Sequence, residues 1–266
     1  MINNYYVIDS HCHIYPDKIA VAATANTDKF YDVTANHNGM VSTLFNLKEE
    51  SGIDHFIVQS VATTPKQVRS INEFIARAVG ENDCMTGLGT LHPDSENMKE
   101  DVLHLKELGL HGVKLHPDIQ QFRIDDPRCL KIYELCEEEG LPILMHTGDS
   151  RYDYSNPNRL KPVCEMFSGL TIVGAHMGGW SIWEKACEEL KGIPNLYFDC
   201  SSTLPWLGAE RTRKLILEHG TDRVLFGSDY PMWDPASELR TFLLMRLGDE
   251  ANRMILSENA KRIFKF

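Results

Sequence analysis

The chain has 266 residues, of which 42% are hydrophobic, and its formal net charge is −11. This composition provides for a sizeable core and argues against a disordered chain. Because the charge is negative and no cluster of lysine or arginine offsets it, nucleic acid and anionic membrane surfaces are poor partners. The expected partner is a small-molecule substrate, and the sequence leaves open whether the chain forms a homo-oligomer.

The N-terminal segment Met1–Tyr6 contains neither a basic region nor a long apolar stretch, so it does not resemble a secretion signal. No run in the chain approaches the roughly 20 apolar residues that span a bilayer. The seven cysteines are odd in number and scattered, and none forms a C-x-x-C pair. They are typical of reduced thiols rather than of disulfides or a zinc ribbon, so we predict a cytoplasmic protein.

Short apolar runs typical of strands alternate along the chain with stretches of helical apolar spacing. The expected strands are Tyr5–Asp9, His55–Ser60, Met85–Leu91, Gly112–His116, Pro142–His146, Leu170–His176, Leu196–Cys200 and Arg223–Ser228. The expected helices between them include Val68–Val79, Met98–Leu108, Pro127–Glu139, Ile182–Leu190 and Ala209–His219. Glycines follow several of these helices, and Asp126-Pro127 and Asp234-Pro235 have the pattern of an N-cap followed by proline.

Eight strand-and-helix units of this kind predict a parallel (β/α)₈ TIM barrel that takes up residues 1–266 as a single domain. The competing arrangement is an open, doubly wound sheet. That fold usually carries a glycine-rich phosphate turn after its first strand, where this chain has His11-Cys12-His13. The polar stretch Ile14–Gly39 is expected to be a long loop that covers the mouth of the barrel.

Two histidines follow the first expected strand with one residue between them, His11 and His13. Because side chains of a strand alternate between its faces, both imidazoles project to the same side. Neutral imidazole is a common ligand of transition metals, so the pair is a candidate metal-binding element.

Other polar side chains lie at the C-terminal ends of later strands, which is where barrels of this type carry their active sites. They are His92, Lys114, His116, His146, His176 and Asp229. His92 and His116 each precede a proline and fit an ordinary hydrogen-bonded core position as well as a chemical one. His11, His13, His146 and Asp229 together offer the nitrogen and oxygen ligands that Zn²⁺ takes in a catalytic site.

Five motifs in this order give the chain a recognisable pattern: His-x-His after the first strand, Gly-Val-Lys-Leu-His-Pro, His-Thr-Gly, His-x-Gly-Gly and Phe-Gly-Ser-Asp-Tyr-Pro. The pattern resembles the amidohydrolase superfamily, in particular the amidohydrolase-related group that includes aminocarboxymuconate-semialdehyde decarboxylase. The resemblance implies a metal bound by His11, His13, His146 and Asp229, with His176 facing the metal-bound water or the substrate.

The resemblance leaves the number and identity of the metal ions open. One divalent ion is expected, with zinc as the first expectation and manganese or iron(II) as alternatives. In some members of the superfamily a lysine at the position of Lys114 is carboxylated and bridges two ions, with the histidine at the position of His176 on the second. Lys114 is equally placed to meet a substrate carboxylate.

A metal of this kind lowers the pKa of bound water and polarises a carbonyl. Asp229 is then the expected proton shuttle, and His176 is expected either to stabilise a developing oxyanion or to orient a ligand. Arg151 and Tyr152, in the loop after His146, are candidates for gripping a substrate carboxylate, or belong to a solvated polar loop. Trp180, Trp206 and Trp233 follow strand ends and are candidates for lining the pocket or for packing.

Four functions compete on these residues. The first expectation is a zinc-dependent hydrolase that cleaves a C–N or C–O bond of a small, carboxylate-bearing substrate. A non-oxidative decarboxylase would use the same metal and the same aspartate. A TatD-like nuclease shares His-x-His and the late aspartate but is disfavoured by the net charge of −11. An inactive binding barrel is disfavoured because every expected ligand position is filled.

Overall fold

The structure is a computed structural model and describes residues 5–266. The first four residues of the segment Met1–Tyr6, on which the prediction about a secretion signal rests, lie outside the described residues. Within residues 5–266, no helix has both the length and the apolar character that crossing a membrane requires. All seven cysteines are buried and unpaired, in agreement with the prediction of reduced thiols.

The strands form a parallel sheet in chain order, in two hydrogen-bonded parts. They are β1 (Ile8–His13), β2 (His55–Gln59), β3 (Met85–Gly87), β4 (Gly89–Thr90), β5 (Val113–Leu115), β6 (Ile143–Met145), β7 (Ile172–Gly174), β8 (Leu196–Asp199) and β9 (Val224–Leu225). β3 and β4 together take the place of the single expected strand Met85–Leu91. The break between them falls at Leu88, whose backbone N–H donates to the carbonyl oxygen of Val58 on β2.

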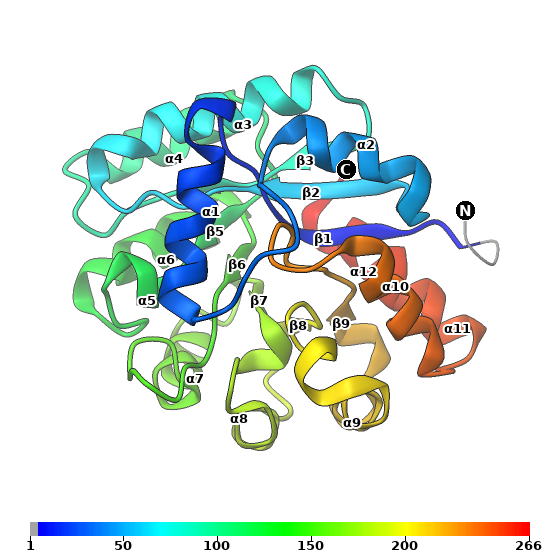
Figure 1. The fold of residues 1–266 in the computed structure, drawn as a ribbon. Coiled ribbons are helices and arrows are strands. Elements are labelled where there is room, and N and C mark those ends of the chain that lie inside the picture. Colours follow the sequence, from blue (N-terminus) through cyan, green and yellow to red (C-terminus); the bar gives the residue numbers. More distant parts are fainter. Residues whose placement is uncertain (1–4) are drawn as a thin grey trace.

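The helices surround the sheet. They are α1 (Asp17–Tyr31), α2 (Val41–Ser51), α3 (Val68–Gly80), α4 (Met98–Glu107), α5 (Pro117–Gln120), α6 (Pro127–Glu139), α7 (Pro157–Met166), α8 (Trp183–Glu189), α9 (Leu204–His219), α10 (Pro235–Leu244), α11 (Asp249–Arg253) and α12 (Asn259–Phe264). Figure 1 shows most of them in a ring outside the strands. This is the predicted (β/α)₈ barrel, and the competing open sheet is excluded.

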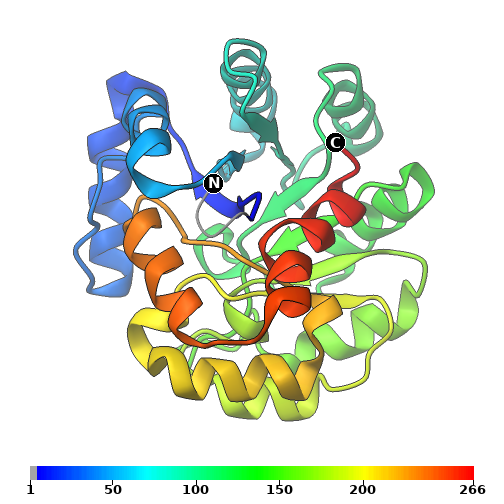
Figure 2. The ribbon, with the colours of Figure 1, turned by 90° about the vertical axis from the view of Figure 1, so that its right-hand side faces the viewer.

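The first and last strands meet, which closes the sheet on itself. The backbone N–H of Ser10 donates to the carbonyl oxygen of Phe226 at 2.9 Å, and Cys12 forms a parallel bridge with Tyr230. At the other end of the barrel, α12 packs Ile263 and Phe264 against the inward-facing Ile8, Ile57 and Leu225. Figure 2, which looks at this end, shows the C-terminal helices crossing the barrel. The C-terminal mouth is therefore the end at which a ligand can enter.

Helix ends follow the predicted capping chemistry. The Asp126 side chain accepts a hydrogen bond from the Arg128 N–H, and the Asp234 side chain accepts one from the Ser237 N–H. Both helices begin with proline, whose fixed φ suits the first helical position. Gly140 ends α6 with a φ of 65°, a left-handed conformation that costs glycine little. Here local sequence signals were sufficient to place the helix ends.

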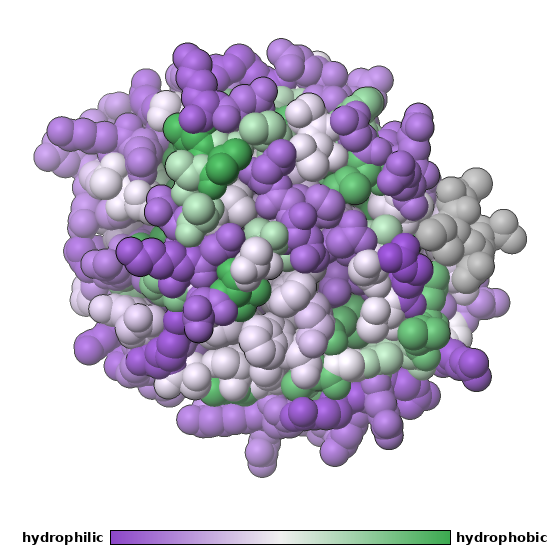
Figure 3. All heavy atoms as spheres, in the orientation of Figure 1, coloured by the Kyte–Doolittle hydropathy of each residue, from purple (hydrophilic) through white to green (hydrophobic). Residues whose placement is uncertain are grey.

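The stretch Ile14–Gly39 is not the loop that the sequence predicts, because α1 occupies most of it. Figure 1 shows α1, in dark blue, in front of the strands and at some distance from the two chain ends. Only Ala20 and Thr24 of α1 are buried, whereas Ile19 and Val21 are 51% and 62% exposed. Figure 3 shows apolar surface over this part of the molecule. The predicted cover of the mouth is thus a helix with weak attachment to the core.

Candidate metal centre and active site

A cavity of about 860 Å³ opens at the C-terminal ends of the strands. This volume is near the upper end of what small-molecule sites occupy, roughly 300–1,000 Å³. Its floor consists of polar side chains from five strand ends: His11, His13, Lys114, His146, His176 and Asp229. The structure therefore brings all the metal-site candidates named from the sequence to one mouth of the barrel. Its walls include α1 and the tryptophans Trp180, Trp206 and Trp233.

Three of these residues point their donor atoms at a common position. Nε2 of His11 lies 3.2 Å from Nε2 of His13 and 3.3 Å from Oδ1 of Asp229, and His13 Nε2 lies 3.8 Å from that oxygen. Ligands about 2.0–2.2 Å from one ion lie about 3.0–3.6 Å from each other in tetrahedral or octahedral arrangements. The spacing and the nitrogen and oxygen donors therefore fit a divalent transition metal held by His11, His13 and Asp229.

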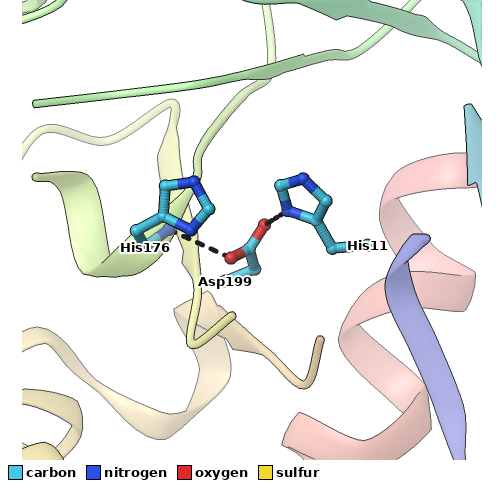
Figure 4. Close-up of side chains that lie close together, drawn as sticks. All are labelled: His11, His176 and Asp199. Atoms are coloured by element: carbon cyan, nitrogen blue, oxygen red, sulfur yellow. Dashed lines mark hydrogen bonds and ion pairs between the residues drawn. The ribbon is translucent and has the colours of Figure 1, made fainter. Parts of the chain in front are cut away.

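His11 is oriented by a buried carboxylate that the sequence analysis did not single out. Asp199 ends β8, and its Oδ2 accepts a hydrogen bond from Nδ1–H of His11 at 2.8 Å (Figure 4). Its other oxygen accepts from the backbone N–H of His176 at 3.0 Å. A proton held on Nδ1 leaves the lone pair of Nε2 free to face the metal position. This is the arrangement in which an outer carboxylate fixes the tautomer of a metal-binding histidine.

The two carboxylate oxygens of Asp229 have different surroundings. Its Oδ2 accepts a hydrogen bond from the Ser202 hydroxyl at 2.6 Å, and that hydroxyl accepts from Nε1–H of Trp233 at 2.7 Å. Oδ1 is thereby directed at the two histidines. Burial raises the pKa of Asp229 to about 7, although the Ser202 hydrogen bond and the Lys114 charge act in the opposite direction. A metal cation at this position would favour the ionised form.

Several residues of the site have backbone conformations that residues other than glycine rarely adopt. The φ angles of His176, Ser202 and Asp229 are 59°, 47° and 65°. For residues other than glycine such a left-handed conformation costs on the order of 1 kcal/mol or more. Strain of this kind persists where surrounding contacts hold it, and it concentrates at functional sites. Its clustering at one end of the barrel supports the assignment of the site.

Lys114 lies fully buried in the middle of the barrel, and its Nζ is 2.9 Å from Nε2 of His11. Burial lowers the pKa of its ammonium group to about 8, while the charges of Asp199 and Asp229 act in the opposite direction. The amine is therefore close enough to the metal position to meet a ligand there, and its loss of a proton is easier than that of an exposed lysine.

His146 lies beside the group formed by His11, His13 and Asp229 rather than within it. Its Nδ1 is 3.0 Å from Nε2 of His176, and its Nε2 is 3.3 Å from the Tyr31 hydroxyl. Among the described residues, its metal-competent neighbours are His116 and Asp118. His146 contributes to the same cavity floor, but its nitrogen atoms face His176 and α1.

Burial favours the neutral form of the histidines that line the cavity, because it lowers their pKa values. Burial is the largest influence in each case, and it lowers the pKa of His11, His13, His116 and His146 well below 6.5. The pKa of His176 falls to about 4 for the same reason. Neutral imidazole is the form that binds a metal, so burial prepares these side chains for that role.

The two remaining histidines at strand ends differ in position. His116 lines the cavity, and its Nε2 is 2.8 Å from the Tyr31 hydroxyl. His92 is buried, and its Nδ1 accepts a hydrogen bond from the backbone N–H of Asp94. It is not among the described residues that line the cavity. His92 therefore has the ordinary structural position that the sequence allowed.

Arg151 and Tyr152 are not among the described residues that line the cavity. All three nitrogen atoms of the Arg151 guanidinium donate hydrogen bonds. Nε and Nη2 donate to the buried Asp149, and Nη1 donates to the carbonyl oxygen of Phe30 at 2.6 Å. Tyr152 is 42% exposed and stacks against Phe30. The structure thus joins this loop to α1, and it does not bring either side chain to the metal position.

Three residues of the site escaped the sequence analysis: Tyr31, Asp199 and Ser202. Asp199 could have been found, because it is a carboxylate at the C-terminal end of an expected strand. No local pattern points to Tyr31 or Ser202. They reach the site through the course of α1 and through the left-handed turn after β8.

We expect Asp199→Asn to weaken metal binding by roughly 10–100-fold while the fold persists. The amide cannot accept from Nδ1–H of His11 and from two backbone N–H groups in the same way, so the His11 tautomer is no longer fixed. The measurement is competition for the metal against a chelator. Asp83→Asn, in the exposed turn before β3 at the opposite end of the barrel, is the control. Equal affinities of the two variants would contradict the orienting role.

Comparisons with known proteins show the family and the fold. A family model described as Amidohydrolase matches residues 8–266. Among curated proteins, none matches the chain significantly. The structure is similar to an uncharacterised TIM-barrel protein from Bordetella bronchiseptica, with 21% identity, a TM-score of 0.80 and coverage of 98% of each chain.

Two similar structures belong to enzymes of different reactions. A 5-carboxyvanillate decarboxylase from Sphingomonas paucimobilis has 17% identity and a TM-score of 0.75, over 99% of this chain and 100% of that one. A probable 2-pyrone-4,6-dicarboxylic acid hydrolase from Acinetobacter baumannii has 17% identity and a TM-score of 0.70, over 98% and 99%. Two further similar structures, both of decarboxylases, contain bound manganese.

Proposed function

The chain belongs to the amidohydrolase family, and from this premise we propose that it is a metal-dependent decarboxylase that releases CO₂ from a small aromatic or unsaturated acid. The proposal replaces the hydrolase that the sequence analysis puts first. Its main support is the character of the cavity, whose polar floor carries the metal donors and whose walls are aromatic and apolar. Several of the similar structures are of decarboxylases, which adds to this support.

The aromatic walls are the observation that favours loss of CO₂ over hydrolysis. Tyr31, Trp180, Trp206 and Trp233 stand around the floor. Planar side chains of this kind suit a planar substrate and reduce the space for water. Hydrolysis needs a positioned water molecule, whereas decarboxylation needs a proton for the carbon atom that the leaving carboxylate vacates.

In this proposal His11, His13 and Asp229 hold one divalent metal, with His146 next to it. Such an ion, when bound, supplies a positive charge that orients the oxygen atoms of the acid and stabilises negative charge that develops on them. Zinc is the first proposal, since two imidazoles and a carboxylate suit it, and manganese is the alternative on the basis of the similar decarboxylases.

Asp229 is the proposed proton donor. When the substrate binds, Oδ1 of Asp229 takes up a proton from the solvent and would no longer be the ionised ligand of the metal. As the C–C bond to the carboxylate breaks and its electron pair stays on the substrate carbon, that proton moves to the carbon, CO₂ leaves and the Asp229 carboxylate is ionised again. Ser202 and Trp233 keep Oδ2 of Asp229 fixed during this transfer. His176 is the second proposed catalytic residue: its Nδ1 lies 2.9 Å from the carbonyl oxygen of Ser201, which leaves Nε2 directed to His146. Lys114 is the proposed partner of a substrate carboxylate.

A hydrolase remains the second candidate, because one of the similar structures is a probable 2-pyrone-4,6-dicarboxylic acid hydrolase. The same donors could then activate a water molecule against a lactone or amide. A second metal ion on a carboxylated Lys114 is an alternative to the single-ion site. About one equivalent of metal in purified protein, retained in Lys114→Ala, would rule it out.

The test is an assay of the zinc- and manganese-loaded protein on hydroxybenzoates, among them 2,6-dihydroxybenzoate, and on unsaturated dicarboxylic acids and lactones. We expect CO₂ release, with a proton from solvent on the vacated carbon and no ¹⁸O from labelled water in the organic product. Chelated protein is the control. Incorporation of ¹⁸O with release of an acid, and no CO₂, would establish the hydrolase instead.

A further inference from the structure

The last residue of α1, Tyr31, extends over the floor of the cavity. Its hydroxyl oxygen lies 2.8 Å from Nε2 of His116 and 3.3 Å from Nε2 of His146. Its ring makes an edge contact with Trp180, with the two centroids 4.9 Å apart. A side chain from the covering helix thus reaches the histidines at the ends of β5 and β6.

Tyr31 lies in a series of hydrogen bonds that runs from His116 through Tyr31 and His146 to His176. The backbone partners of the two outer histidines determine which atom donates in each bond. Nδ1 of His116 accepts from the Ile119 N–H, so its proton is on Nε2 and is donated to the Tyr31 oxygen. At the other end, Nδ1–H of His176 donates to the carbonyl oxygen of Ser201, so its Nε2 accepts from Nδ1–H of His146. Nε2 of His146 is then an acceptor, and the Tyr31 O–H donates to it.

The side chain of Arg151 binds the C-terminal end of α1. Its Nη1 donates to the carbonyl oxygen of Phe30, which is in the last turn of the helix and has no partner within it. A cation at this end also interacts favourably with the helix dipole. The same guanidinium is paired through Nε and Nη2 with Asp149, which is 0% exposed, so Arg151 is itself held in place.

The rings around this guanidinium strengthen the connection. Its central carbon lies 5.0 Å from the centroid of the Phe30 ring and 5.3 Å from that of Tyr31, both on α1. On the other side it lies 5.2 Å from the ring of Tyr152 and 5.4 Å from that of Trp180. These distances are within the range of cation–π attraction, about 6 Å. Arg151 therefore joins α1 to the barrel at the residue that carries the hydroxyl.

We propose that Tyr31 is a substrate-contacting residue that donates its O–H to an anionic oxygen of the bound acid, and that Arg151 is the positioning residue that keeps it there. The proposal rests on the proposed function, since it needs an acid in this cavity. A neutral imidazole at 3.3 Å is a weak acceptor. A carboxylate or phenolate oxygen is a stronger one, so the O–H turns to the substrate when it binds.

The first experiment compares Tyr31→Phe with the parent enzyme on the acid that gives CO₂. Loss of one hydrogen bond to a charged oxygen is expected to lower kcat/KM by about 10- to 100-fold. Tyr154→Phe is the control, because it removes a hydroxyl from the loop next to Arg151 and its residue is outside the described cavity lining. A kcat/KM for Tyr31→Phe within twofold of the control would overturn the contact.

The second experiment tests Arg151 with a measurement that does not need turnover. In Arg151→Met we expect amide hydrogen exchange in residues 17–31 to be roughly 10-fold faster or more, with the rest of the barrel unchanged. Arg159→Met is the control: Arg159 is likewise an arginine paired with carboxylates, here Asp125 and Asp153, and among the described residues its hydrogen bonds go to these two and not to α1. Unchanged exchange in Arg151→Met would overturn the positioning role.

The double variant Arg151→Met/Tyr31→Phe shows whether the first residue acts through the second. If it does, the double variant has the kcat/KM of Tyr31→Phe alone, whereas multiplied losses would contradict the link. If no acid releases CO₂, the proposed function fails independently, and two measurements still decide this inference. They are hydrogen exchange and the affinity of the metal-loaded protein for 2,6-dihydroxybenzoate, which Tyr31→Phe should weaken about 10-fold or more.

Discussion

The double variant His11→Ala/His13→Ala is expected to lose both the metal and all turnover while the barrel stays folded. The two imidazoles are two of the three donors within 3.2–3.8 Å of one another, so one carboxylate is left to hold the ion. The loss of affinity should exceed the roughly 10–100-fold that follows removal of an outer partner. The measurements are metal content after dialysis, CO₂ release and thermal unfolding.

The thermal unfolding temperature of the double variant should change little in comparison with its loss of metal and turnover. Both side chains lie at the cavity floor, and His13 is 13% exposed, so their removal leaves no large void in the packed layers. His104→Ala, on the partly exposed face of α4, is the control for loss of a histidine in general. Full metal content in the double variant would show that the metal binds elsewhere.

Asp229→Asn is expected to lower kcat by about 10²–10⁴-fold, the contribution of a positioned proton donor, even with saturating metal. The amide keeps the shape of the side chain and its bond with Ser202, but it cannot carry and return a proton. His11 and His13 remain in place, so the variant should still bind metal, more weakly. The measurement is a titration of activity with metal, followed to saturation.

The outcome separates two roles of the same carboxylate. If saturating metal restores turnover to near the parent value, Asp229 is a ligand alone and another residue must supply the proton. His176 would then be the next candidate, because it lines the same cavity, and it would have to take up a proton on Nε2 before it could donate one. If the defect persists at saturation, the loss lies in proton transfer.

The fold and the floor of the site could be predicted from the sequence because their signals are local. Alternating apolar runs predicted the strands, and residues at the ends of parallel strands meet at one edge of the barrel whatever the loops do. His11, His13, His146, His176 and Asp229 line one cavity for this reason. The strand ends were predicted less accurately: the sequence predicted that the first strand ends at Asp9, whereas β1 extends through His13.

The cover of the mouth could not be predicted, because α1 gives little local signal. It has no side-chain hydrogen bond at its N-cap and buries only Ala20 and Thr24. A helix with so few local stabilising features depends on tertiary contacts, and one contact at its C-terminal end comes from Arg151, 121 residues after Phe30 in the chain. From sequence, Arg151 was a candidate either for gripping a substrate carboxylate or for belonging to a solvated polar loop, whereas in the structure it binds Asp149 and the backbone of α1.

The sequence by itself therefore determined the barrel, the end at which chemistry occurs and most of the metal donors, since these depend on periodicity and on strand ends. Only the tertiary structure decided which donors share one position, that Asp199 fixes the tautomer of His11, and that Tyr31 reaches the floor. Those features depend on distances between residues far apart in the chain and on left-handed turns at His176, Ser202 and Asp229. Neither has a sequence pattern, because the surrounding packing, rather than local preference, stabilises them.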